Sequence, residues 1–380
     1  MTARHAPTEE ALAALRFLEP ELAHQPCGVD IVRALLDPRY AGEALHIVED
    51  DEPALVARLA YHRLLPQLQR ALASEQIVMT PRAVRAVSGS SSQLAITALR
   101  LERMLVEVGQ LLEEGGVEFV VLKGLATRHL DHLETWHRQS SDVDLLVRRE
   151  QLPIAGTILR DAGYTAPDEA HVLMDKGESW RSPLGDGVDL HTRLHTAARP
   201  LPTRWWQTTE RFETAGHRFL ALNRAGRLAH AASHYAVAYP NHRILSSVLD
   251  QQAISIVASA EERAAASEML QEIGVGDIVH RISKRVATLL DDPELVLGAP
   301  SSRPLDLVLR RAYDRPDLDK VAMKLAKTFG MPSVDRRRVL RNWLRPSEEY
   351  LASGGYRSRR DRVASIARRR LHARRDSARR

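Results

Sequence analysis

The chain has 380 residues, of which 44% are hydrophobic and 27% are charged, an ordinary composition for a soluble globular protein. It contains no run of about 18 or more apolar residues, which argues against a membrane-spanning helix. Cys27 is the only cysteine and excludes an internal disulfide, and the N-terminus lacks the apolar segment of a signal peptide. These features predict a cytoplasmic protein.

Charge is distributed unevenly along the chain. Residues 356–380 contain eleven arginines against two aspartates, a net charge of +9, so the remaining 355 residues sum to −4 within the overall +5. The basic character of the protein therefore belongs to this C-terminal tail. We interpret the tail as a solvated terminus, and the alternative is an electrostatic contact with nucleic acid, an anionic surface or an acidic partner.

The first part of the chain, residues 8–110, is predicted to be mainly helical. Short helices are expected at 9–17, 31–36, 53–73 and 81–87. A longer helix is predicted from about 91 to 114, because its apolar residues recur about every 3.6 positions. Gly115 and Gly116 are typical of a helix end.

The middle of the chain changes to strand patterns, and helical patterns then return. Strands are predicted near 117–122, 142–148, 171–181 and 187–192, with a helix at 150–162. Later helices are expected at 223–239, 243–258, 260–273, 275–290, 303–312 and 317–328. The predicted fold class is α+β, in which a small mixed β-sheet core is flanked by helical regions. Its divisions are a helical region 1–114, a core 115–204, a second helical region 205–355 and the tail 356–380.

Two aspartates stand two residues apart in the apolar segment 141–147. In a strand, residues i and i+2 point to the same face, so Asp142 and Asp144 lie side by side while Val143 and Leu145 face a core. Two neighbouring carboxylates repel each other unless a cation lies between them, and oxygen ligands favour Mg²⁺ or Mn²⁺. A strand-end turn with two solvated aspartates is the structural alternative.

Two further segments strengthen the metal interpretation. Upstream, a buried strand leads through Lys123 and Gly124 into a helix start, where backbone N–H groups and a lysine suit a phosphate. Downstream, Asp189 and His191 share one face of another strand and supply a third carboxylate. Three acidic residues beside such a turn favour metal-assisted phosphoryl chemistry, in which a shared carboxylate holds two ions and Asp189 accepts a proton.

These motifs resemble an uncharacterised bacterial nucleotidyltransferase-like family of the polymerase-β-type nucleotidyltransferase superfamily. The segments that carry the resemblance are Leu122-Lys123-Gly124, Arg138, 141–147, Ala162-Gly163-Tyr164 and 188–191. Less specific similarity extends over roughly residues 10–356, and includes 56–68, 228–234 and Leu249-Asp250. The wider superfamily usually has Gly-Ser or Gly-Gly in its phosphate-binding turn. Here Leu125 follows Gly124, so the turn itself has no serine hydroxyl.

The resemblance implies an enzyme that moves an NMP from an NTP to a hydroxyl or phosphate of an acceptor and releases pyrophosphate, with Mg²⁺ or Mn²⁺ as cofactor. It implies catalytic and metal-binding roles for Asp142, Asp144 and Asp189. The implied nucleotide-binding residues are Lys123, Gly124, Arg138 and Ser141. No motif names the acceptor, which is a small molecule, a peptide, a protein or a nucleic acid.

Two other functions fit the same residues. One is a non-catalytic, regulatory nucleotide-binding module, and the other is an RNA-directed transferase that uses the basic tail. The acidic balance of residues 1–355 counts against the second. His230 and His234 are four residues apart on a predicted helix and could share a metal, but no glutamate follows His230 as in zinc proteases. We therefore interpret them as residues of packing or helix–helix hydrogen bonding.

Overall fold

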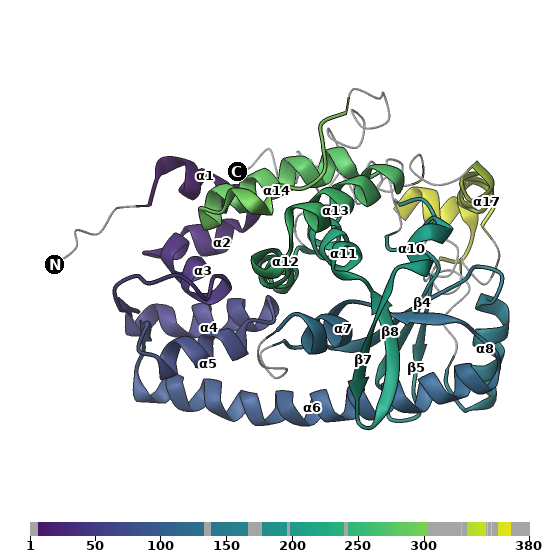
Figure 1. Cartoon of the computed structure of the whole chain (residues 1–380), viewed down its shortest axis with the longest axis horizontal. Helices are drawn as coiled ribbons and strands as arrows, with labels where there is room; N and C mark the ends of the chain where they lie inside the picture. The colour runs from purple at the N-terminus through teal and green to yellow at the C-terminus, as the bar shows by residue number, and fades with distance from the viewer. Residues whose placement is uncertain are drawn as a thin grey trace.

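The computed structural model describes residues 7–132, 138–165, 177–195, 198–238, 242–301, 333–346 and 356–365, together with 328, 348 and 351. Helices of the N-terminal region lie at one end and a β-sheet at the other, and one long helix runs beneath both (Figure 1). The helix predicted at 303–312, and the one at 317–328 apart from its last residue, lie outside the described residues, as do residues 366–380 of the tail.

Five α-helices precede the long helix among the described residues of the N-terminal region. They are α1 (Glu9–Leu18), α2 (Pro20–Ala23), α3 (Gly28–Leu36), α4 (Glu52–Tyr61) and α5 (Leu65–Ala73). A short parallel sheet of β1 (Leu45–His46) and β2 (Ile77–Val78) borders them. The prediction of one helix over 53–73 is wrong, because the chain turns between α4 and α5. Pro66 lacks an N–H and its ring clashes with a carbonyl one turn earlier, so the helix does not continue through it.

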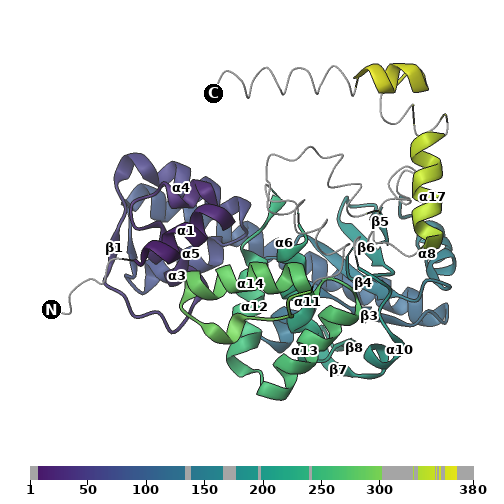
Figure 2. The same cartoon turned by 90° about the horizontal axis from the view of Figure 1, so that it is seen from above.

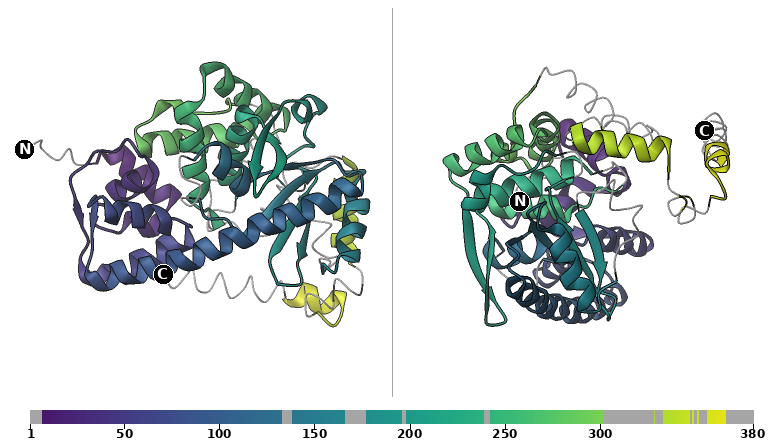
Figure 3. Two further views of the ribbon diagram at one scale, coloured as in Figure 1. Left: turned by 60° about the horizontal axis from the view of Figure 1, so that its bottom comes forward. Right: turned by 90° about the vertical axis from the view of Figure 1, so that its right-hand side faces the viewer.

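Helix α6 (Pro81–Glu114) is continuous over 34 residues, although the sequence predicted two helices separated at 88–90. Thr80 caps its first turn by accepting a hydrogen bond from the Ala83 N–H, and Pro81 occupies the first helical position. The helix extends from the N-terminal helices to the sheet (Figure 3). Packing at both ends therefore outweighs the weak helix propensity of the serines and glycine at 88–92, in the first third of the helix.

The main sheet has six strands among the described residues. In spatial order they are β5 (Gly177–Arg181), β6 (Gly187–His191), β4 (Asp142–Val147), β3 (Phe119–Val121), β8 (His217–Leu222) and β7 (Thr209–Thr214). The β4–β6 and β3–β8 pairs are parallel and the others are antiparallel. This mixed sheet with helical flanks confirms the predicted α+β class. The β7–β8 hairpin was not predicted, and its strands lie after residue 204, where helices were expected.

The two faces of the sheet have different partners. One face packs against α6 and α8 (Leu152–Asp161) in a cluster of buried side chains that includes Leu105, Val143 and Leu145. The other face belongs to a larger cluster with the C-terminal helices. These helices are α11 (Arg224–Ala236), α12 (Ser246–Val257), α13 (Ala260–Glu272) and α14 (Gly276–Leu290). Remaining elements are η1 (Glu49–Asp51), α7 (Lys123–Leu130), α10 (Thr203–Gln207), η4 (Pro293–Leu295) and α17 (Ser333–Leu344).

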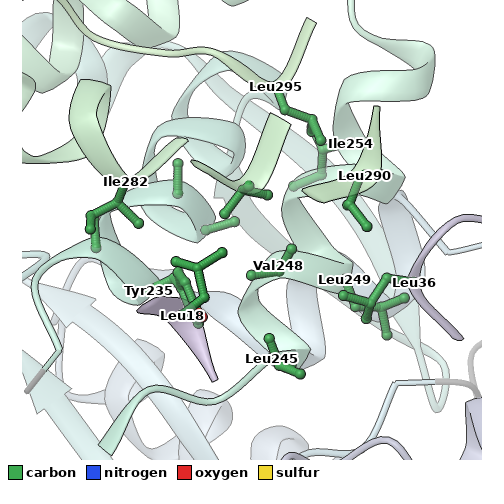
Figure 4. Close-up of a cluster of buried hydrophobic side chains, with 14 of the residues drawn as sticks. Leu18, Leu36, Tyr235, Leu245, Val248, Leu249, Ile254, Ile282, Leu290 and Leu295 are labelled. Atoms are coloured by element: carbon green, nitrogen blue, oxygen red, sulfur yellow. The ribbon is translucent and has the colours of Figure 1, made fainter. Parts of the chain in front are cut away.

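The N-terminal and C-terminal helices share one core. Helices α1 and α3 lie beside α14 (Figure 2). Leu18 and Leu36 from the N-terminal region are buried in the same cluster as Tyr235, Val248 and Ile282 (Figure 4). Apolar contact therefore joins the N-terminal helices to α11–α14, and the sheet packs against these helices. No helix of the described residues has the length and hydropathy needed to cross a lipid bilayer.

Two buried ion pairs connect the sheet region to the C-terminal helices. Arg138, which precedes β4, donates from Nε and Nη2 to the two carboxylate oxygens of Asp250 on α12, at 2.6 and 2.8 Å. Arg227 on α11 binds both carboxylate oxygens of Asp131, which follows α7, at 2.7 Å each. In one pair the sheet region supplies the cation and in the other the anion, so the two pairs fix how these helices dock.

Asp250→Asn tests the first of these pairs. The substitution removes the carboxylate that binds the buried guanidinium of Arg138, and we expect the free energy of unfolding to fall by about 3 kcal/mol. Urea denaturation measures this loss. As a control, Glu213→Gln breaks an exposed pair with Arg218 and is expected to cost less than about 1 kcal/mol. Equal, small losses in the two variants would contradict the role given to Asp250.

Acid stability gives a second test of the same pair. Burial alone would raise the pKa of Asp250, but Arg138 and His132 outweigh this and lower it to about 2. A carboxylate with a depressed pKa in the folded state stabilises the protein above its unfolded pKa of about 3.9 and loses that effect as the pH falls towards 2. The stability difference between wild type and Asp250→Asn should therefore shrink by about 2 kcal/mol between pH 5 and pH 2. A difference independent of pH contradicts this.

Candidate active site

The parallel pairing of β4 with β6 brings acidic side chains together. Asp144 lies in register with Asp189, and Asp142 lies in register with Gly187. Asp142 and Asp144 occupy the face opposite the buried Val143, as strand alternation predicts. Because Gly187 has no side chain, the strand beside Asp142 leaves that face open, and a Cβ there would lie 3.6 Å from the Cβ of Asp142.

Asp144, Asp189 and His191 each place one potential ligand atom within 4.8 Å of the others. His191 Nε2 lies 2.7 Å from Asp144 Oδ1 and 3.9 Å from Asp189 Oδ2. Asp144 and His191 are buried, whereas Asp189 is partly exposed. Two carboxylate oxygens and an imidazole nitrogen are a donor set that fits a divalent metal, so the residues present suit such an ion.

Lys123 provides positive charge to this group. The Leu122 N–H donates to the Asp144 carbonyl at 2.9 Å, so the next residue along the chain lies directly beside that aspartate. Lys123 Nζ then contacts Asp144 Oδ1 at 2.5 Å. The backbone of Lys123 adopts a left-handed conformation with φ 48°, which is uncommon outside glycine. The backbone of this turn is therefore strained at the residue whose ammonium group contacts Asp144.

Gly124 lies in the first turn of α7, close to Ser140. A Cβ at Gly124 would lie 2.2 Å from the Ser140 Oγ, so only glycine leaves room for that hydroxyl. Ser140 is 6% exposed, and its hydroxyl has no hydrogen-bond partner among the described residues. Ser141 itself is exposed and donates to Asp142 Oδ1 at 3.1 Å. The buried hydroxyl beside the helix start thus comes from Ser140, which the sequence did not single out.

Arg138 is fully engaged by protein groups. Besides its two bonds to Asp250, its Nη1 donates to the Gln139 carbonyl. Burial disfavours the charged form, but attraction by Asp250, Asp142 and Asp144 outweighs burial and raises the pKa of Arg138. Arg138, which was predicted to bind nucleotide, therefore stays charged near Asp142 and Asp144, and Asp250 of α12 holds its guanidinium.

A cleft of about 250 Å³ opens over these residues. It is lined by Lys123, Gly124, Arg138, Ser140, Asp142, Asp144 and Asp189 on the sheet side. Its opposite wall includes Arg63, Arg227, His230, His234, Ser246, Ser247 and Asp250. Ser141 is not part of the lining. The cleft therefore combines three parts of the chain, and most of its opposite wall went unrecognised in the sequence.

The histidines of α11 have both packing contacts and access to the cleft. Their rings lie 6.2 Å apart, and each lies within 6 Å of the His195 ring. His234 Nδ1 is 2.9 Å from Ser247 Oγ, which connects α11 to the start of α12. These contacts agree with the predicted role in packing or helix–helix hydrogen bonding, and the position of both histidines in the cleft lining was not predicted. Their spacing of four residues was the available signal, since it places both on one helix face.

Comparisons with known proteins give one family and several distant structures. Two structures of ANT(2'')-Ia, one in solution and one in complex with adenylyl-2''-tobramycin, are each 12% identical with a TM-score of 0.35. They cover 45% of this chain, and 91% and 97% of their own chains. An antigenic nucleotidyltransferase-like protein from Paracoccidioides brasiliensis is 14% identical, with a TM-score of 0.31, and covers 50% of this chain and 92% of its own.

Comparison with curated proteins gives no match. The model of a family described as uncharacterised nucleotidyltransferase matches residues 49–291, which is more than half of the chain. These residues include the acidic strands, the Lys123 turn and the helices that form the opposite wall of the cleft. The chain therefore belongs to this uncharacterised nucleotidyltransferase family, as its motifs predicted.

Proposed function

We propose that the protein is a Mg²⁺- or Mn²⁺-dependent nucleotidyltransferase that moves an NMP from an NTP to a hydroxyl or phosphate oxygen of an acceptor. The observation that carries this proposal is the convergence of Asp144, Asp189 and His191, whose potential ligand atoms lie within 4.8 Å of one another. A divalent ion bound there supplies charge neutralisation at the phosphates and at the attacking oxygen. The family membership of the chain supports the same reaction class.

The carboxylates take the roles expected from their positions. In this proposal Asp144 and Asp189 of the 4.8 Å group hold the metal together with Asp142, which is not one of those three residues but lines the same cleft. Asp189, which is partly exposed, accepts the proton of the attacking hydroxyl. His191 orients Asp144 through their 2.7 Å contact. Ser141 orients Asp142 in the same way from the cleft edge. The proposal assigns Ser141 a positioning role, because its side chain does not line the cleft.

The nucleotide phosphates bind at the first turn of α7. Lys123 contributes an ammonium, and Gly124 allows the close approach of backbone N–H groups at the positive end of the helix. Ser140 supplies the hydroxyl that the Gly124-Leu125 turn lacks, since its buried oxygen already lies beside Gly124. Arg138 adds positive charge behind the acidic pair while Asp250 keeps it in place. Catalysis then consists mainly of positioning and charge neutralisation.

Replacing both aspartates of β4 tests the function directly. Asp142→Asn combined with Asp144→Asn removes two metal-binding carboxylates. We expect it to abolish incorporation of α-labelled NMP from any of the four NTPs in the presence of Mg²⁺ and cell extract. Circular dichroism and thermal unfolding check that the variant is folded.

A matched control removes the same charge elsewhere. Asp50→Asn combined with Asp161→Asn changes two exposed aspartates that do not line the cleft, and this variant should label its acceptor as well as wild type does. Labelling that persists in the Asp142/Asp144 double variant would refute the assignment of the metal-binding residues.

A further inference from the structure

One cation of the cleft has no carboxylate partner among the described residues. Lys123 contacts Asp144, Arg138 contacts Asp250, and Arg227 binds the carboxylates of Asp131 and Glu210. Arg63 also lines the cleft, but its guanidinium makes no hydrogen bond or ion pair within the part of the chain that the structure describes. The positive charge left available for an incoming anion therefore comes from the N-terminal helical region.

The turn that carries Arg63 is attached to the opposite wall of the cleft. The neighbouring residue His62 is fully buried, and its carbonyl accepts from the Ser246 N–H at 3.3 Å. Its Nδ1 accepts from the Leu245 N–H at 3.3 Å, and its Nε2 lies 2.9 Å from Glu19 Oε2. These contacts fix the turn against the start of α12, so the position of Arg63 at the cleft does not depend on a free loop.

The backbone at Arg63 has a conformation that glycine adopts more readily than arginine. The Leu64 N–H donates to the Leu59 carbonyl and the Arg63 N–H to the Ala60 carbonyl, which closes the end of α4. Arg63 has φ 59°, the left-handed conformation in which glycine is the usual residue at such helix ends. An arginine there costs steric strain that glycine avoids. Unlike glycine, Arg63 places a cationic side chain at the wall of the cleft.

We propose that Arg63 binds the terminal phosphates of the NTP, opposite the Lys123 turn. This inference rests on the proposed function and extends it, because the N-terminal helical region then contributes a substrate ligand. The triphosphate is the anion that fits, since the same cleft holds the helix start, the Ser140 hydroxyl and the acidic group that suits a metal. An arginine recognises phosphate oxygens through paired N–H donors.

Arg63→Gly is the informative variant. Glycine removes the cation and relieves the left-handed backbone, so the variant should melt close to the wild-type temperature. We expect Mg²⁺-dependent binding of an α,β-imido NTP analogue, measured by calorimetry, to weaken about tenfold or more, while binding of the corresponding NMP stays unchanged. Arg63→Lys retains the charge but lacks the paired N–H donors, so it should recover part of the lost affinity.

Glu75→Gly is the matched control. Glu75 is an exposed charged residue at another left-handed helix end, with φ 56°, and it does not line the cleft. Its replacement should leave both affinities unchanged. The inference is overturned if Arg63→Gly binds the triphosphate analogue as tightly as wild type, if it loses NMP affinity equally, or if it loses only acceptor turnover. Failure of the wild-type protein to bind any of the four NTP analogues would overturn the proposed function as well.

Discussion

The site depends on one constraint. Two carboxylates lie side by side on neighbouring parallel strands, and they need positive charge between them. Asp144 and Asp189 are in register on β4 and β6, and Asp144 is almost fully buried. Like charges so placed are unfavourable without a cation. Lys123 and His191 both contact the same oxygen of Asp144. In the proposed reaction, a divalent ion neutralises the same carboxylates, and Lys123 then binds the nucleotide phosphates instead of Asp144. Metal binding and substrate binding are therefore coupled through the acidic group.

The helical regions complete the site. The sheet supplies the acidic group and the phosphate-binding turn, whereas α11 and α12 close the cleft and are fixed to the sheet region by Arg138–Asp250 and Arg227–Asp131. The N-terminal helices share a core with α14 and present Arg63 at the cleft. A buried ion pair gives little net stability but is costly to break, so these pairs serve docking geometry. The cleft forms only where all three parts meet.

Local sequence patterns predicted the strands that carry the acidic residues of the site. Strand alternation placed Asp142 and Asp144 on one face, and it placed Asp189 and His191 on one face, because side-chain direction along a strand depends only on neighbouring residues. The β7–β8 hairpin was missed because its turn is Ala215-Gly216. Both residues have positive φ, but the pair lacks the Asn-Gly or Asp-Gly signal of such turns.

Contacts across long stretches of chain were not predictable in the same way. The pairing of Arg138 with Asp250 spans 112 residues, and that of Arg227 with Asp131 spans 96. No periodic pattern encodes which helix docks on which turn, so Asp250 was noticed only as part of a family motif. Arg63 was hidden inside a predicted continuous helix, although Pro66 marked the break that exposes it. Ser140 was passed over for its neighbour because the two serines differ in burial and in the approach of Gly124, and both are features of the folded chain rather than of the local sequence.

A crystal of the protein grown with Mn²⁺ and an α,β-imido NTP analogue gives the most direct measurement of the central claim. We expect an anomalous peak between the carboxylates of Asp142, Asp144 and Asp189, with Lys123 turned from Asp144 towards the phosphates. Manganese bound elsewhere, with Lys123 still on Asp144, would contradict it.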